Sequence, residues 1–267
     1  MTSEPPRPKP VKMLVRRHSL VVRATHWINA ISLCLLLFSG LQIFNAHPQL
    51  YFGQQSDFGH SWLGMGAYAS GGTLHGVTRL GPFVFDTTGF LGVSSQQGGA
   101  VSRGFPAWLT IPSTQYLALG RRWHFFFAWV FAINIAIYLA SAFLGGHLKR
   151  DLAPTLDQLK PRHVLQKGAY LGVVLVLLPL MILTGMTMSP SLDANFPWLL
   201  DLFGGRQSAR SIHFITASLI VLFFFVHIAM VVLAGPWNEV RSMITGRYAI
   251  EVEPPPPVLP EPIGDAP

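Results

Sequence analysis

The sequence predicts an all-α integral membrane protein, a four-helix bundle with a long folded external loop between helices one and two. Three observations support this fold class. Half of the 267 residues are hydrophobic, 12% are charged and the mean hydropathy is +0.41, whereas a soluble domain has about a quarter charged residues. Four apolar stretches reach about 20 residues, which is enough to cross about 30 Å of hydrocarbon. The basic residues are concentrated in alternate connecting segments.

The apolar stretches predict transmembrane helices over residues 23–46, 119–146, 167–189 and 210–236. Each is rich in Leu, Ile, Val and Phe all the way round, which excludes an amphipathic surface helix. The first stretch is too long for a cleaved signal peptide, and no convincing cleavage site follows it. The single cysteine, Cys34, lies inside it. An intrachain disulfide, a cysteine-ligated cluster and covalent haem attachment are therefore excluded.

The charge distribution predicts the topology. Thirteen of the nineteen Lys and Arg residues lie before or at the start of helix one, between helix two and the start of helix three, or after helix four, whereas residues 47–118 contain only Arg79 and Arg103. Because basic segments stay on the cytoplasmic side, we expect both termini to be cytoplasmic. The net charge of +7 thus orients the chain in a lipid bilayer, and no nucleic-acid partner is predicted.

The connecting segments differ in composition. Residues 47–118 hold 13 of the 25 glycines and eleven aromatic residues, which argues against disorder and predicts a folded periplasmic cap. The cap could dock a partner or only shield the helices. The other segments are a cytoplasmic arm over 1–22 (flexible over 1–15), a cytoplasmic loop over 147–166, a periplasmic loop over 190–209, an interfacial segment with a short helix over 237–250, and a disordered Pro-rich tail over 251–267.

Four of the ten histidines lie in the predicted helices, at His26, His124, His213 and His227. The alternating helix directions place His26 and His227 toward the inner face, and His124 and His213 toward the outer face. His213 and His227 are 14 residues apart, so they point within about 40° of each other and lie roughly 21 Å apart along the helix. This pattern predicts two metal centres at two depths, each a b-type haem iron held by two imidazoles.

The alternative for a histidine at a helix end is a simple interfacial polar residue. It applies to three of the four but not to His227, which apolar residues flank on both sides. His47, His60 and His75 lie in the 47–118 segment, where loop polarity is the favoured interpretation over a metal site. Arg23, Arg121 and Arg210 each precede a predicted ligand by three residues. They are candidates to hold haem propionates, and lipid anchoring is the alternative.

Small and polar residues inside the helices have two interpretations. Gly40, Thr184 and Gly185 would let a flat macrocycle approach the backbone, although helix packing is slightly favoured. Asn29 and Asn134 are more typical of bonding between helices than of quinone binding.

Three sequence pieces carry a family resemblance. They are Arg23-Ala-Thr-His-Trp-Ile-Asn-Ala, Arg121-Arg-Trp-His-Phe-Phe-Phe, and Ser211-Ile-His-Phe with His227-Ile-Ala-Met and Gly235-Pro-Trp-Asn-Glu. The chain resembles the bacterial di-haem cytochrome b family, which includes membrane subunits of formate dehydrogenase, nickel–iron hydrogenase and thiosulfate reductase. The resemblance covers roughly residues 23–46 and 119–248, and the 72-residue segment between them departs from the compact family pattern.

The resemblance implies an electron-transfer subunit of the bacterial inner membrane without catalysis of its own. It would carry two non-covalent haem b groups and exchange electrons with quinone or quinol near the inner haem. Its partner would be a periplasmic redox protein, of the molybdopterin-dependent type. Two alternatives remain: a stand-alone oxidoreductase acting on quinone and a small periplasmic substrate such as superoxide, and a haem-free transporter or membrane anchor.

Overall fold

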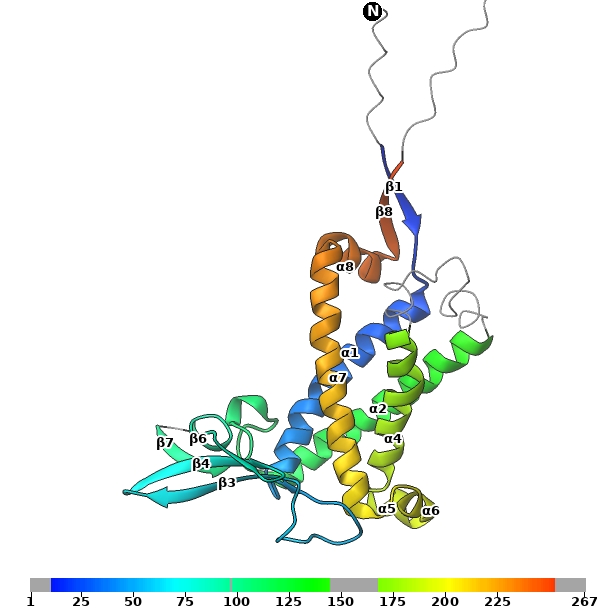
Figure 1. Cartoon of the computed structure of the whole chain (residues 1–267). Coiled ribbons are helices and arrows are strands. Elements are labelled where there is room, and N and C mark those ends of the chain that lie inside the picture. The colour runs from blue at the N-terminus through cyan, green and yellow to red at the C-terminus, as the bar shows by residue number, and fades with distance from the viewer. Residues whose placement is uncertain (1–10, 97, 145–167, 253–267) are drawn as a thin grey trace, which may run out of the picture. The chain divides into compact units, whose positions relative to one another are not determined.

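The computed structural model describes residues 11–96, 98–144 and 168–252. It is mostly helical, and four helices are long and apolar enough to cross a membrane (Figure 1): α1 (Leu20–Phe44), α2 (Leu117–Leu144), a third helix (Gly168–Met186) and α7 (Arg206–Ala234). All four predicted helices are therefore present. The predicted loop over 147–166 lies outside the described residues. The chain divides into two units, a larger one of Ala24–His227 and a terminal one of Met1–Arg23 with Ile228–Pro267.

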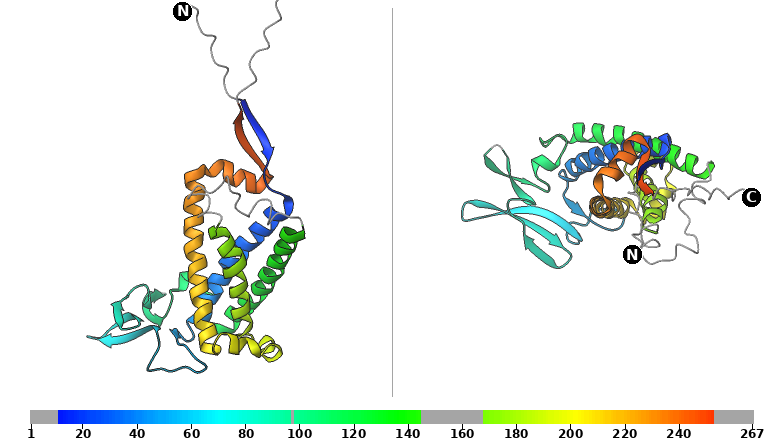
Figure 2. Two further views of the ribbon diagram at one scale, coloured as in Figure 1. Left: turned by 45° about the vertical axis from the view of Figure 1, so that its right-hand side comes forward. Right: turned by 90° about the horizontal axis from the view of Figure 1, so that it is seen from above.

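The four helices of the larger unit lie side by side (Figure 2) and share one apolar cluster. Phe131 and Ile135 of α2, Leu178 of α4 (Leu178–Met186) and Ile220 of α7 form its buried centre, and side chains of α1 pack against it. Elsewhere the helix surfaces are exposed, with only 6% of the apolar window of α7 buried. Such apolar, uncovered surfaces are those that lipid chains solvate.

The third helix contains a π-helical turn, η4 (Val173–Leu177), directly before α4. Single π-helical turns widen a helix locally and change which residues face a neighbour. This turn separates Tyr170 from Thr184, two residues that contact histidines of α7.

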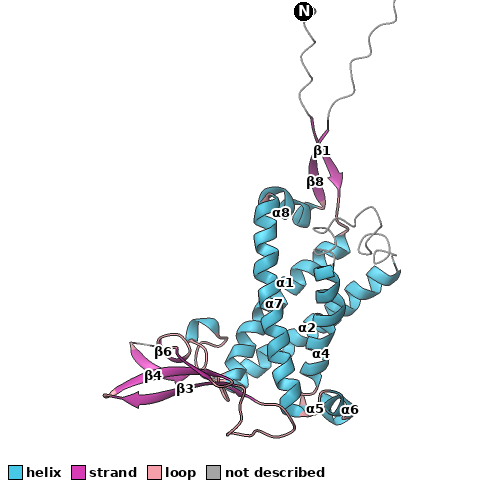
Figure 3. Ribbon diagram, in the orientation of Figure 1, coloured by secondary structure: helices cyan, strands magenta, loops and turns pink. Residues whose placement is uncertain are grey.

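The 47–118 segment is folded, but it is built from strands, so the all-α prediction is incomplete (Figure 3). One antiparallel sheet has the order β2-β3-β4-β5, and β6 pairs with β7 as a separate hairpin. The strands are β2 (Gln49–Leu50), β3 (Leu63–Ser70), β4 (Thr73–Leu80), β5 (Phe83–Asp86), β6 (Gly92–Gln96) and β7 (Gly99–Arg103), followed by the short 3-10 helix η1 (Ala107–Leu109). Gly71 and Gly72 join β3 to β4 with φ of 57° and 79°, the tight hairpin turn that glycine permits.

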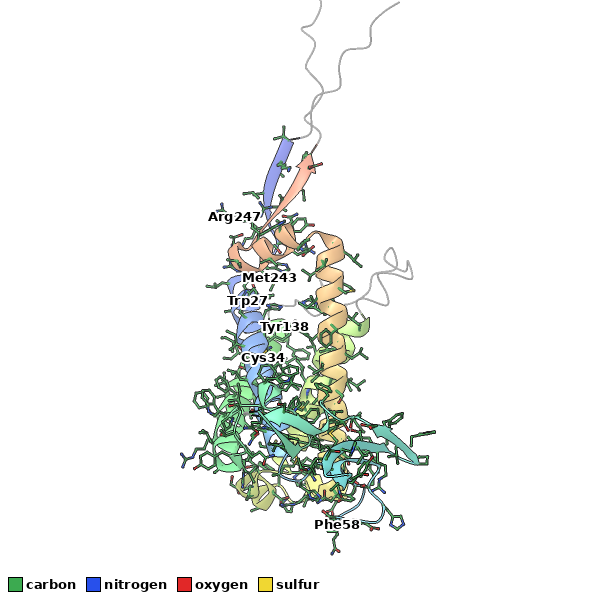
Figure 4. All side chains as sticks on the ribbon, turned by 90° about the vertical axis from the view of Figure 1, so that its left-hand side faces the viewer. Trp27, Cys34, Phe58, Tyr138, Met243 and Arg247 are labelled. Atoms are coloured by element: carbon green, nitrogen blue, oxygen red, sulfur yellow. The ribbon has the colours of Figure 1, made fainter. Side chains whose placement is uncertain are left out.

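The 47–118 segment lies at one end of the helices. In Figure 4 its side chains, including Phe58, gather at that end, whereas Trp27 of α1 lies toward the other end. Phe44 at the end of α1 packs with Leu50, Leu63 and Met65 in one buried cluster. The segment is thus part of the same core as the helix ends, and not a detached loop.

The start of α7 is set by this segment. Gly53 O accepts hydrogen bonds from the backbone N–H groups of Gln207 (3.0 Å) and Ser208 (3.2 Å), and Gln54 Oε1 accepts one from the N–H of Arg206 (2.7 Å). N–H groups in the first turn of a helix have no acceptor within the helix. Gly53 and Gln54 supply these acceptors, so α7 can begin at residue 206, four residues before the predicted start. The predicted 190–209 loop also contains two short helices, α5 (Pro190–Asn195) and α6 (Trp198–Leu202).

The terminal unit corrects the predictions for both chain ends. β1 (Val11–Arg16) pairs antiparallel with β8 (Arg247–Val252), so part of the predicted flexible arm and the first residues of the predicted disordered tail form a two-stranded ribbon. The predicted short helix is present as α8 (Pro236–Thr245). Residues 1–10 and 253–267 lie outside the described part of the chain.

Candidate metal centres

The four helical histidines come together in two pairs, both within the larger unit. His26 of α1 faces His227 of α7, with ring centres 6.3 Å apart and planes at 57°. His124 of α2 faces His213 of α7, with ring centres 6.4 Å apart and planes at 65°. The pairing is the one that the alternating helix directions predict.

The ring separation is the one that a shared metal requires. An imidazole nitrogen binds a first-row metal at about 2 Å, and its ring centre lies about 1.15 Å behind it, so two imidazoles on one metal have centres roughly 6.3 Å apart. Both pairs match this value within about 0.1 Å. Among the described residues, no group of three or more His, Cys, Asp or Glu could hold a metal. Each pair thus offers two imidazole nitrogens, which suits a metal whose remaining ligands come from a cofactor, such as the iron of haem.

Two hydroxyl groups determine which ring nitrogen of His124 and His213 carries the proton and which keeps its lone pair. Ser39 Oγ lies 3.1 Å from His124 Nδ1, and Thr184 Oγ1 lies 3.0 Å from His213 Nδ1. Each hydroxyl donates its single proton to a backbone carbonyl, Ser39 to Leu35 O (2.6 Å) and Thr184 to Leu180 O (2.7 Å). It can therefore only accept from the imidazole, so Nδ1 carries the ring proton and Nε2 keeps the lone pair that binds a metal.

A glycine follows each of these hydroxyl residues and faces the same ring. A Cβ added at Gly40 would lie 3.3 Å from His124 Cε1, and one added at Gly185 would lie 3.4 Å from His213 Cε1. Any larger residue would press on the ligand ring. The repeated hydroxyl-glycine pair, Ser39-Gly40 and Thr184-Gly185, was a signal in the sequence whose role in holding these rings the prediction missed.

The His26–His227 pair is held differently. The hydroxyl of Tyr170 lies 3.3 Å from His227 Nδ1, and Phe223 stacks on the His227 ring at 5.9 Å. Trp27 meets the His26 ring edge-on at 5.3 Å. The sequence analysis did not identify Tyr170, although its spacing from Thr184 is 14 residues, the same as that between His213 and His227.

The three predicted propionate-binding arginines contact neutral groups. Arg210 donates to His47 O and lies over the Phe44 ring (5.8 Å), and Arg121 lies 5.5 Å from the Phe125 ring centre. Within the terminal unit, Arg23 donates to Ile244 O at 2.7 Å. Their role toward propionates stays a prediction.

The intramembrane asparagines join two helices. Asn134 Nδ2 donates to Asn29 Oδ1 (2.7 Å) and to Thr25 O (2.8 Å), which ties α2 to α1. This is the interhelical role that the sequence favoured. The histidines of the 47–118 segment have local partners: His60 pairs with Asp57 at 2.7 Å, and His75 stacks on Tyr68 at 5.2 Å.

Four apolar spanning helices with two facing imidazole pairs are typical of the membrane-embedded b-type cytochromes. Comparison with known proteins identifies the family within this class: the profile of the prokaryotic cytochrome b561 family matches residues 17–246. The chain belongs to this family, which confirms the predicted resemblance. It is therefore a multi-pass membrane protein that binds haem b and transfers electrons.

One curated relative is the putative protein-methionine-sulfoxide reductase subunit YedZ1 of Azospira oryzae. It is 26% identical to this chain over 248 residues, which cover 86% of the chain and 96% of the relative. No solved structure matches the chain.

Proposed function

We propose that the chain is a four-helix bundle of the bacterial inner membrane that holds two haem b groups, one between His26 and His227 and one between His124 and His213. It relays electrons between the quinone pool and a redox partner on the outer face, with both termini cytoplasmic. The observation that carries the proposal is the presence of two imidazole pairs with the ring spacing of a shared iron, 6.3 and 6.4 Å. Helix α7 supplies one histidine to each pair, and these two residues, His213 and His227, lie about 21 Å apart along the helix axis.

The residues around the two pairs fit this role. Bound haem b supplies a one-electron iron couple. Ser39 and Thr184 hold the Nδ1 protons of His124 and His213 and so fix the orientation and basicity of both rings. Ile220 lies seven residues from each α7 histidine, and its cluster with Phe131 and Leu178 fills the level between the pairs. This apolar layer excludes water from the path.

The relative's name supports a reductase as the partner. YedZ1 is described as a subunit of a protein-methionine-sulfoxide reductase, and a reductase consumes electrons. We therefore favour flow from quinol, oxidised near the His26–His227 pair, toward a partner reductase docked on the 47–118 segment. Quinol oxidation releases two electrons and two protons, and the electrons pass singly to the partner. By family resemblance the partner is molybdopterin-dependent.

The haem content of the purified full chain tests the proposal. A pyridine haemochrome assay is expected to give two haem b per chain, and the reduced-minus-oxidised spectrum is expected to show b-type haem with two potentials. One haem per chain would contradict the paired assignment, and none would contradict haem binding altogether.

Removing one hydroxyl is expected to change a potential without losing a haem. Ser39→Ala deletes the group that accepts the Nδ1 proton of His124, which makes that imidazole a weaker electron donor. The midpoint potential of the His124–His213 haem should rise by on the order of 20–60 mV, the equivalent of a net hydrogen bond of about 0.5–1.5 kcal/mol. Potentiometric titration measures this shift.

The matched control is Ser218→Ala. Ser218 also donates to the carbonyl four residues earlier, Phe214 O at 2.9 Å, but it is exposed on α7. An equal shift in both variants would show that Ser39 does not act through the His124 ring.

A further inference from the structure

A basic pocket in the terminal unit has the character of an anion site. It encloses about 440 Å³ at the junction of β1, β8 and the end of α8. Three arginines and a histidine contribute to its walls, together with the turn that ends α8: Arg16, His18, Arg23, Thr245, Gly246 and Arg247. None of the described residues that line it is acidic. Arg247, which lines the pocket at the start of β8, is labelled in Figure 4.

The register of the ribbon places two of these cations directly opposite each other. Arg16 of β1 is the cross-strand partner of Arg247 of β8. Like charges in this position repel, because directly opposed Cβ atoms are only about 4.5–5.5 Å apart. The same face carries the complementary pair Lys12 and Glu251 at the other end of the ribbon. A bound anion would remove the repulsion at the Arg16–Arg247 end.

Arg23 adds a third guanidinium with spare donors. One of its terminal nitrogens donates to Ile244 O at 2.7 Å, whereas its buried Nε has no acceptor among the described residues. The nearby carboxylate of Glu239 is engaged by Arg17 at 3.1 Å. Gly246, with φ of 80°, permits the close approach, since a Cβ there would lie 3.3 Å from the Arg23 guanidinium. Converging guanidinium groups without a carboxylate suit a phosphate, which accepts several hydrogen bonds at once.

The helix beside the pocket indicates where the phosphate comes from. α8 exposes Trp237 (89%), Val240 (40%) and Ile244 (61%), an i, i+3, i+7 stripe on one face. An amphipathic helix of this kind lies at the membrane interface with its apolar face toward the acyl chains. The pocket therefore opens at the level of phospholipid headgroups. We propose that it binds the phosphate headgroup of an anionic phospholipid.

The test uses the full haem-loaded chain in non-ionic detergent, titrated with phosphatidylglycerol and followed by native mass spectrometry and thermal unfolding. The wild type is expected to retain one lipid and to unfold at a higher temperature with phosphatidylglycerol than with phosphatidylcholine, whose choline cation the arginines repel. In R16Q/R247Q the apparent Kd for phosphatidylglycerol should rise about tenfold or more. The single variants R16Q and R247Q should each show part of this loss.

The control is K12Q/R241Q, which removes two cations of the same unit outside the pocket and is expected to leave lipid retention unchanged. Equal losses in both double variants would reduce the effect to general charge attraction and overturn the proposal. Stabilisation of the wild type by inorganic phosphate alone, equal to that by lipid, would assign the pocket to a free anion instead. Loss of haem from R16Q/R247Q with lipid retention intact would assign it to a propionate.

Discussion

His213→Ala is expected to leave one haem per chain and to stop electron transfer through the protein. The substitution removes one of the two imidazoles whose ring centres are 6.4 Å apart, and His124 alone would hold the haem too weakly for it to stay bound. The other pair does not include this residue and lies about 21 Å away along α7. Quinol-driven reduction of an outer acceptor should fall at least about a hundredfold, because loss of a supporting partner alone costs 10–100-fold at metal sites.

His227→Ala is the complementary variant. It should also leave one haem, but the one with the other potential, so potentiometric titration of the two variants identifies each centre. The double variant should be colourless. His75→Ala, at a half-buried position of β4 in the 47–118 segment, serves as the control and is expected to keep both haems. Loss of both haems from either single variant would show that the two pairs are not independent sites.

The second large effect is expected from Arg103→Met. Arg103 is 3% exposed and its guanidinium is surrounded by neutral acceptors. It donates to Phe105 O (2.7 Å), Gln96 Oε1 (3.0 Å), Ser113 O (3.0 Å), Thr110 Oγ1 (3.0 Å) and Gln42 Oε1 (3.4 Å). Burial lowers the pKa of this guanidinium, although an arginine keeps its charge at neutral pH. These bonds tie the end of β7 to the 105–114 chain and to α1.

Methionine fills a similar volume and makes none of these bonds, so several buried acceptors lose their partner. We expect a loss of about 3–5 kcal/mol in the stability of the 47–118 segment. Limited proteolysis should then cut this segment while haem stays bound. Arg79→Met is the matched control, since the Arg79 side chain makes a single hydrogen bond to the described residues, to Ser61 Oγ at 2.6 Å. If both variants were cut at the same rate, the Arg103 network would not be what holds the segment.

The helices could be predicted from the sequence because hydrocarbon imposes a length and an apolar composition that few other structures share. The histidine pairing could also be inferred, since the direction of each helix places its residues at a definite depth. Both arguments use only position along a helix. They need no knowledge of side-chain contacts.

The strands could not be predicted in the same way. Four of those in the 47–118 segment, β3, β4, β6 and β7, contain glycine, and their sequences mix small, polar and apolar residues with little period-two alternation. The ribbon pairs residues 11–16 with residues 247–252. These segments are far apart in the sequence, and the residues near either one do not indicate that they pair. Ser39 and Tyr170 were missed for a related reason. A hydroxyl in a helix more often bonds its own backbone, and only the packing of two helices reveals that it also faces a ring.

The hydrogen bonds that join Gly53 and Gln54 to the first turn of α7 restrict how this helix can move. Some conformational switches slide one helix past its neighbours by about 1–2 Å or more, but the start of α7 is hydrogen-bonded to Gly53 and Gln54. Sliding of α7 would break these hydrogen bonds and would shift His213 and His227 together, because both lie on this helix. Gly53 and Gln54 therefore fix the position of both α7 ligands, and breaking their hydrogen bonds, unlike loosening β7 at Arg103, would displace both histidines at once.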